Sequence, residues 1–189
     1  MYDKTQEKII DATMELVIQK GYLLTTTKEI AENAGVNEST IFRRFKNKKE
    51  IILSAMQLAK WNPSLKETDF QSTGDIRKDL ISFSQEYMRK VTPQMVKISI
   101  GLRAPELVKE TSKGILQVPM TFKKVLVNYF DEYLPNKSIS SENLAMQFLS
   151  MNFGFVFLKA SFGKQLSAIE ATDYITNSVN VFMSGINNM

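Results

Sequence analysis

Five basic side chains lie close together in one short stretch of the chain, and they are the residues best suited to bind a charged partner. Residues 39–49 contain no acidic residue and hold Arg43, Arg44, Lys46, Lys48 and Lys49. Because the whole chain carries 24 basic and 20 acidic residues, a net charge of +4, the local concentration of charge points to a polyanion such as nucleic acid. A basic face that is merely solvated is the alternative that charge alone leaves open.

The composition argues against catalysis. The chain has no His and no Cys, which excludes imidazole bases, thiolate nucleophiles, disulfides and almost every zinc or haem site. It also lacks a glycine-rich phosphate loop. We therefore expect no catalytic residue, no metal site, no cofactor and no enzymatic activity.

Length and hydrophobicity set the class of protein. A chain of 189 residues, 43% hydrophobic and 23% charged, fits one or two globular domains. Apolar residues recur at three- and four-residue spacing almost throughout, which predicts an all-α fold. No run is long and apolar enough to span a membrane and the first residues do not resemble a signal peptide, so we expect a cytoplasmic protein without a membrane partner.

Two short helices position the basic stretch. Thr26 and Glu29 form a capping box that opens a helix over 27–34, and Gly35 ends it. A helix over 38–44 follows, capped by Asn37, with Ile41 and Phe45 facing inward. This is a helix-turn-helix, whose second helix enters a DNA major groove. The side chains left on the exposed faces are Glu38, Ser39, Thr40, Arg43 and Arg44.

Flanking helices complete a small N-terminal domain, predicted over 1–47. A first helix begins near Asp3 or Thr5 and ends at Lys20, and a connecting helix over 48–60 opens at Asn47. The backbone N–H groups at the openings after Thr26 and Asn47 are suited to bind phosphate. A linker over 61–74 leads into a larger helical domain, predicted over 48–189 when the connector is included.

The larger domain is predicted to be helical to its end. One helical face runs from Ile76 to Val91. Pro105 and Pro119 are expected in the first turns of helices, Ser140 or Ser141 caps a long helix to about residue 162, and a capping box of Ser167 and Glu170 opens the last helix.

The first 55 residues resemble the DNA-binding region of the TetR (tetracycline-repressor-like) transcriptional regulators. The matching runs are 8–12 (KIIDA), 21–22 (GY), 25–31 (TTTKEIA), 34–36 (AGV) and 39–51 (STIFRRFKNKKEI). Several short motifs coincide at the separations that the family shows. The rest of the chain matches the family only in length and helicity.

The resemblance implies roles for single residues in DNA binding. Glu38, Ser39 and Arg43 occupy positions where bases are read. Glu38 could accept from a cytosine amino group, but it is more simply explained as an acid at a helix N-terminus. For Arg43, contact with phosphate or solvent is an equally good alternative to base reading. Lys28 lies in a matching run and is counted with the DNA-binding residues. Three residues depart from the family pattern, because Phe42 replaces Tyr, Arg44 replaces His and Ser39 replaces Gly. The positions near phosphates are those of Thr26, Thr40, Phe42, Arg44 and Lys48.

Aromatic and Met residues of the larger domain are candidates to line a pocket for a small apolar or aromatic effector, which the resemblance also implies. Ordinary core packing is the alternative for each of them. The polar candidates Arg103, Glu106 and Gln147 are more simply explained as surface or helix-end groups. The pocket candidates are Phe83, Tyr87, Met88, Met95, Leu102, Met120, Phe122, Tyr129, Met151 and Phe155.

The last two helices carry more apolar surface than a monomer normally exposes, which favours a two-fold homodimer. The candidates for its interface are Phe148, Phe153, Phe157, Phe162, Val179 and Phe182. A dimer would place two recognition helices in successive major grooves of a palindromic operator. We therefore expect a DNA-binding transcriptional regulator, most simply a repressor, released by an unidentified small effector. The alternatives are a DNA-binding regulator without small-molecule control and a helical protein that binds apolar ligands.

Overall fold

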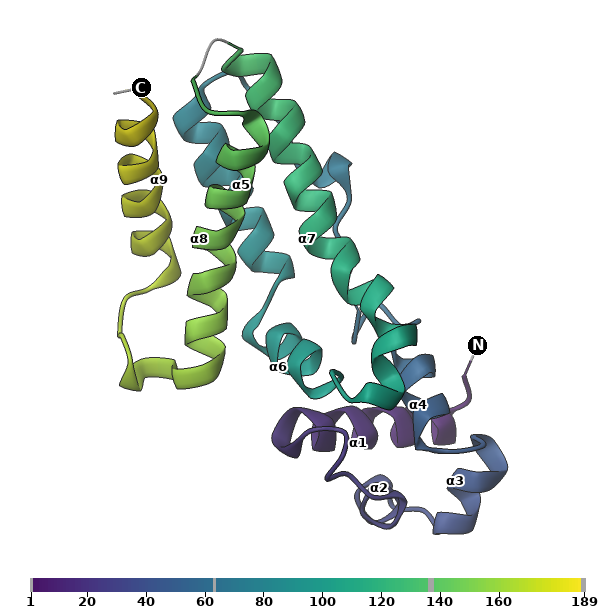
Figure 1. The fold of residues 1–189 in the computed structure, drawn as a ribbon. Helices are drawn as coiled ribbons and strands as arrows, with labels where there is room; N and C mark the ends of the chain where they lie inside the picture. Colours follow the sequence, from purple (N-terminus) through teal and green to yellow (C-terminus); the bar gives the residue numbers. More distant parts are fainter. Residues whose placement is uncertain (1, 63, 136–137, 188–189) are drawn as a thin grey trace. The chain divides into compact units, whose positions relative to one another are not determined.

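The computed structural model describes residues 2–62, 64–135 and 138–187, and all regular secondary structure in these ranges is helical (Figure 1). The prediction of an all-α fold is therefore confirmed. Short 3₁₀ turns cover Glu67–Asp69 and Gly163–Gln165. The α-helices are α1 (Lys4–Lys20), α2 (Thr27–Ala34), α3 (Glu38–Arg44), α4 (Lys48–Ala55), α5 (Ile76–Lys90), α6 (Pro93–Gly101), α7 (Pro105–Tyr133), α8 (Ser141–Phe162) and α9 (Ala171–Asn187).

The chain divides into two compact units. The N-terminal unit contains the described residues of 1–63 and 94–116, and the C-terminal unit contains those of 64–93 and 117–189. Helix α7 contributes its first part to the N-terminal unit and the remainder to the C-terminal unit.

The N-terminal unit has a core of aliphatic side chains. Helix α1 packs against α2 and α4, and α2 packs against α3. Helix α6 ends against α1, where Tyr22 N–H donates to the Gly101 carbonyl at 3.3 Å. A Cβ atom at Gly101 would lie 3.0 Å from the Val17 carbonyl oxygen, a tight contact that glycine avoids. The fully buried residues include Ile9, Ile10, Ile30, Ile41, Ile51 and Ile52.

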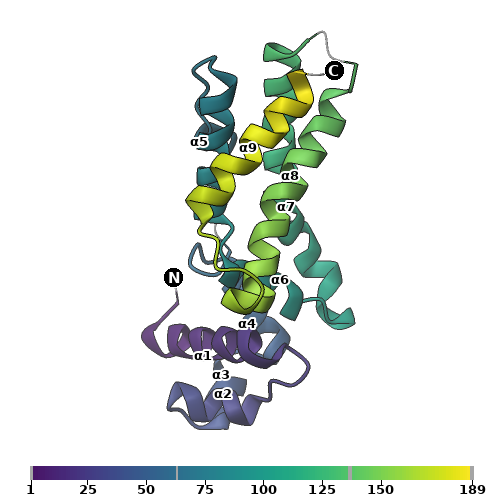
Figure 2. The same cartoon turned by 90° about the vertical axis from the view of Figure 1, so that its left-hand side faces the viewer.

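The C-terminal unit is built around aromatic rings. Helix α5 packs against α8 and α9. Figure 2 shows α8 and α9 beside the later part of α7. Phe148 and Phe182 pack with their ring centres 5.1 Å apart. The buried carboxylate of Asp79 accepts hydrogen bonds from the backbone of Thr73 and Gly74 and from the Tyr129 hydroxyl, at 2.8 to 3.0 Å.

Most predicted helix ends are confirmed, and a few are corrected. The capping box of Thr26 and Glu29 is present, and the Asn47 side chain accepts from Glu50 N–H. Asn37 precedes α3, but its side chain makes no capping hydrogen bond. Pro119 lies inside α7 and opens no helix.

The last helix also begins later than predicted. Helix α9 starts at Ala171, because Ser167 accepts from the N–H of Ile169 in a local turn instead of capping the helix. Helix α4 ends at Ala55. The chain then continues in turns that bring Trp61 into the core of the N-terminal unit. The first part of the predicted linker is therefore packed structure.

None of the helices in the described ranges is both long enough and apolar enough to cross a lipid bilayer.

Candidate nucleic-acid interface

Helices α2 and α3 form the predicted helix-turn-helix, which we call the reading head. Gly35 takes a left-handed conformation, with φ 66° and ψ 39°, and its N–H caps the end of α2. Residues 35–37 make up this turn and lead into α3. The predicted inward side chains, Ile41 and Phe45, are buried in the core of the N-terminal unit. The opposite face of α3 is therefore left to solvent.

The solvent face of α3 carries the predicted DNA-binding side chains. Ser39, Arg43 and Arg44 are exposed, Thr40 is half-buried, and the ring of Phe42 is 54% exposed. A phenyl ring this open on a short helix has no role in the core. Thr26 and Lys28, at the start of α2, are also exposed.

Glu38 is exposed but not free. Its carboxylate accepts a hydrogen bond from the Thr27 hydroxyl at 2.6 Å, which joins the first turn of α3 to the first turn of α2. This contact gives Glu38 a structural role in fixing the two helices. The cytosine contact considered for Glu38 would have to share or break it.

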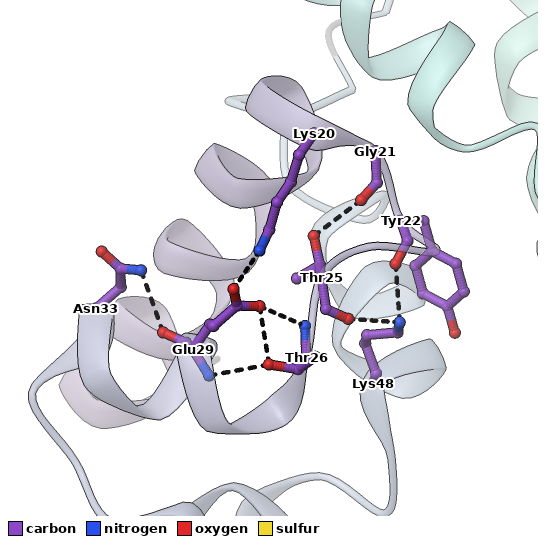
Figure 3. A network of polar contacts seen from close by, with 8 residues as sticks. All are labelled: Lys20, Gly21, Tyr22, Thr25, Thr26, Glu29, Asn33 and Lys48. Atoms are coloured by element: carbon purple, nitrogen blue, oxygen red, sulfur yellow. Dashed lines mark hydrogen bonds and ion pairs between the residues drawn. The ribbon is translucent and has the colours of Figure 1, made fainter.

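Lys48 is tied to the protein's own backbone (Figure 3). Its ammonium donates to the carbonyl oxygens of Tyr22, at 2.8 Å, and Thr25, at 2.7 Å. It also lies 4.0 Å from the centre of the Tyr22 ring, a cation–π contact. An ammonium has three N–H donors, so one remains for a phosphate. The chief role of Lys48 in this structure is to hold α4 to the turn between α1 and α2.

An acidic residue of α7 completes the surroundings of Lys48. Burial, followed by the nearby Glu106 carboxylate, raises the pKa of Tyr22 to about 12. Burial lowers the pKa of Lys48, and Glu106 acts in the opposite direction. Glu106 therefore lies within electrostatic reach of both side chains in the N-terminal unit.

A second polar network holds the first turn of α2 (Figure 3). The Glu29 carboxylate accepts from the backbone N–H of Thr26 at 3.0 Å and from its hydroxyl at 2.8 Å, and it pairs with the Lys20 ammonium. The Lys20 and Thr26 hydrogen bonds lower the pKa of Glu29 to about 2. Because both the hydroxyl and the backbone N–H of Thr26 donate to Glu29, a phosphate at this place would have to compete with the Glu29 carboxylate for either donor.

Two of the five basic residues of the 39–49 stretch are paired with acids that lie far away in the sequence. Arg44 Nη1 is 2.9 Å from Asp3 Oδ2, and Lys49 Nζ is 2.6 Å from Glu110 Oε1. Within the described ranges, Arg43 forms no ion pair.

Lys46 likewise forms no ion pair with any described residue, and it is exposed. The stretch that reads as five unopposed cations in sequence is thus partly neutralised in the fold. Sequence reasoning gave no DNA-related role to Asp3, Tyr22 or Glu110, because their partners are 26 to 61 residues away.

The pocket candidates divide into two groups. Four of them form one aromatic cluster inside the C-terminal unit, joined by Phe70, which sequence reasoning did not single out. Tyr87 stacks on Phe122 with ring centres 4.4 Å apart, and Phe83 meets Tyr129 edge-on at 5.1 Å. Tyr87 is almost fully buried, and burial raises the pKa of its hydroxyl.

The other pocket candidates lie elsewhere. Leu102 belongs to the core of the N-terminal unit. Met95 is half-buried and lies in the same unit. Met120 is exposed, because residues two apart on a helix face different directions and Phe122 takes the inward one.

Met88, Met151 and Phe155 are half-buried. Phe155 stacks on Tyr174 at 4.1 Å. Met151 lines an open hollow of about 620 Å³ along α8 with Asn143, Met146, Gln147 and Ser150.

The candidates for the dimer interface also fall into two groups, one buried and one exposed. Phe148, Val179 and Phe182 are buried within the C-terminal unit, where packing among α8, α9 and α7 accounts for them. Phe153, Phe157 and Phe162 are 40%, 36% and 54% exposed along α8. Of these candidates, only the second group remains exposed in the structure.

The described part of the chain contains no group of three or more Asp and Glu residues arranged to hold a metal ion.

Comparisons with known proteins agree with this geometry. A family model described as "Bacterial regulatory proteins, tetR family" matches residues 9–55, the segment that holds α2, α3, α4 and most of α1. The chain is 31% identical over 186 residues to the HTH-type transcriptional regulator YvkB of Bacillus subtilis, covering 96% of this chain and 97% of that protein.

Solved structures share the fold. NalD, the secondary repressor of the MexAB-OprM multidrug efflux pump in Pseudomonas aeruginosa, superposes with a TM-score of 0.70 at 15% identity, covering 97% of this chain and 95% of that chain. The transcriptional regulator FadR of Bacillus subtilis, in complex with stearoyl-CoA, gives a TM-score of 0.64 at 18% identity over 95% and 98% of the two chains.

Proposed function

Because this chain belongs to the TetR family of DNA-binding transcriptional regulators, which are not enzymes, we propose that it is a repressor that binds a palindromic operator as a homodimer and leaves it when a small apolar or aromatic effector binds. The observation that carries the proposal is the solvent face of α3. Arg43 is exposed there beside Ser39 and has no carboxylate partner among the described residues. Its guanidinium is therefore available to guanine, while the buried Ile41 fixes the opposite face of α3 in the core.

The dimer follows from the apolar face that α8 leaves open. Phe153 and Phe157 lie with their ring centres 6.0 Å apart, and both are more than a third exposed. A second copy that brings the same face would bury these rings in a two-fold helical interface. Two reading heads one helical repeat apart then require a palindromic operator.

The effector class follows from the aromatic cluster of the C-terminal unit. Its rings are packed against each other, so a ligand must insert between them or displace one. Tyr87, an almost fully buried member of this cluster, would bring its hydroxyl to such a ligand as a hydrogen-bonding group. The similar structures include a repressor of a multidrug efflux pump and a transcriptional regulator in complex with stearoyl-CoA, which support repression and an apolar effector.

Release requires that the effector bind better to a conformation whose reading heads no longer match the operator. To test this, the purified protein first selects its operator from DNA fragments. Binding to that operator is then followed by fluorescence anisotropy while stearoyl-CoA and planar aromatic compounds are added in turn. The proposed pocket is supported if one of these compounds releases the wild type from DNA but not the Tyr87→Phe variant, and the variant binds the operator as tightly as the wild type in the absence of the compound. Release that Tyr87→Phe leaves intact contradicts that place for it.

The dimer has its own test in sedimentation equilibrium. Phe157→Glu should yield monomers, because it places a charge in the proposed apolar interface. Gln85→Glu, which adds the same charge at an exposed position of α5, should leave the dimer intact. Wild-type protein that sediments as a monomer would contradict the proposal.

A further inference from the structure

Arg44 is the exposed cation of α3 that already has a partner within the chain. Its guanidinium is 2.9 Å from the Asp3 carboxylate, and 40% and 45% of the two side chains remain open to solvent. Building on the proposed function, we propose that Asp3 sets the DNA affinity of the protein: it positions Arg44 in the free state and yields it to a DNA phosphate when DNA binds.

The two carboxylate oxygens of Asp3 have separate tasks. Oδ1 accepts the backbone N–H groups of Thr5 and Gln6, both at 2.9 Å, and so caps α1. The Gln6 side chain returns a contact to the Asp3 N–H at 3.1 Å, which completes a capping box. Oδ2 takes no part in the cap and faces Arg44. The helix therefore fixes the position of the acid, and the acid fixes the position of the arginine.

The exchange follows from the chemistry of the three groups. A guanidinium presents five N–H donors in a planar fork that suits a phosphate as well as a carboxylate. An ion pair this exposed is weak and screened by salt, whereas duplex DNA offers a phosphate about every 1.7 Å along its axis. After the exchange, the Asp3 carboxylate remains beside the bound phosphate and repels it. The acid thus lowers affinity for any duplex.

Among the described basic residues of the 39–49 stretch, only Arg44 combines an acidic partner with a place on the recognition helix. Lys49 is also paired, but it lies in α4, and Arg43 and Lys46 have no acidic partner there. Asp3 is therefore the acid whose removal should alter the contact of α3 with the DNA backbone.

Asp3→Asn isolates this role. Asparagine caps helices as well as aspartate does, so its Oδ1 preserves the α1 cap while an amide nitrogen replaces Oδ2. The matched control is Glu7→Gln, which removes the same charge one turn further along α1, where the exposed Glu7 forms no ion pair with a described residue. Arg44→Ala, alone and combined with Asp3→Asn, shows whether the effect passes through the arginine.

The full-length proteins are titrated by fluorescence anisotropy with a random-sequence duplex and with a selected operator, between about 50 and about 200 mM salt. Asp3→Asn is expected to tighten both duplexes about two- to fivefold at the lowest salt and to steepen the salt slope by up to about 1. Glu7→Gln should change either affinity by less, and Asp3→Asn should have no effect once Arg44 is alanine.

Each contrary result is informative. Equal effects of Asp3→Asn and Glu7→Gln, or a gain that persists in the Arg44→Ala background, would overturn the exchange while leaving the proposed function standing. Unchanged binding by Arg44→Ala would overturn it as well. Wild-type protein that binds neither duplex at low salt would instead overturn the proposed function, and the inference with it.

Discussion

The Lys48 ammonium donates to the Thr25 carbonyl oxygen at 2.7 Å, which joins the first residue of α4 to the segment that leads into α2. Replacing Lys48 by Met removes this bond and the one to Tyr22, so the Thr25 carbonyl loses this donor while the Tyr22 carbonyl keeps the backbone N–H of Thr25. We expect the free energy of unfolding to fall by about 2 kcal/mol in urea denaturation. The salt slope of DNA binding should fall by no more than about 1, because one N–H remains for a phosphate.

The control for this variant is Lys46→Met, which removes a charge two residues away at an exposed site without an ion pair among described residues. Its stability should stay within about 0.5 kcal/mol of the wild type. A Lys48→Met protein as stable as the control would show that the two carbonyl contacts do not stabilise the fold.

Arg43 is expected to read sequence. Arg43→Ala should weaken binding to the operator more than binding to random DNA, because a bidentate contact with guanine contributes about 1 to 3 kcal/mol of discrimination. Lys46→Ala, which removes an exposed cation three residues later, should weaken both DNAs alike. Anisotropy titrations on the two duplexes measure the difference. Equal losses on both duplexes for Arg43→Ala would assign it to phosphate.

The Lys20–Glu29–Thr26 network predicts a pH dependence. The pKa of Glu29 is lowered from 4.5 to about 2 by its hydrogen bonds with Lys20 and Thr26. A carboxyl whose pKa is lower in the folded state stabilises it above its unfolded pKa, and that contribution is lost as the pH falls through the folded pKa. Between pH 4.5 and about 2 the wild type should therefore lose stability that Glu29→Gln does not lose.

Gln at this position keeps the capping box, so the comparison isolates the charge. Urea midpoints measured across this pH range give the result. Glu32→Gln, in the same helix and without an ion pair among described residues, should follow the wild-type curve. Superimposable curves for the wild type and Glu29→Gln would show that the Glu29 charge contributes nothing to stability.

The carboxylate of Asp79 should be essential to the C-terminal unit. Burial acts to raise its pKa, but hydrogen bonds from Thr73, Tyr129 and Gly74 outweigh burial and hold the pKa below its ordinary value. Asp79→Asn places an amide among these donors, and we expect a loss of about 2 to 4 kcal/mol in unfolding free energy. Tyr129→Phe removes one donor and should cost about 1 kcal/mol. A smaller loss for Asp79→Asn than for Tyr129→Phe would contradict this account.

The N-terminal unit could be predicted well because its signals are local. Thr26, Glu29 and Gly35 determine the ends of α2 by contacts within a few residues, and the spacing of Ile41 and Phe45 sets the inward face of α3. Asp3, which pairs with Arg44 across 41 positions of sequence, could not be found in this way.

In the C-terminal unit the pattern of apolar residues was ambiguous. Helix α8 is apolar on more than one side, so spacing alone could not separate the buried Phe148 from the exposed Phe157. Pro119 was predicted in the first turn of a helix, because that is where proline is best tolerated. In the structure the 29-residue helix α7 continues through it.

Whether α3 reads a DNA sequence can be decided by selecting genomic fragments with the purified protein. The best fragment and a scrambled version of it are then titrated at the same salt concentration. The account predicts a palindromic fragment bound at least about a thousandfold more tightly than the scrambled duplex. Equal and steeply salt-dependent binding to both would contradict it, because the basic residues would then only hold phosphates.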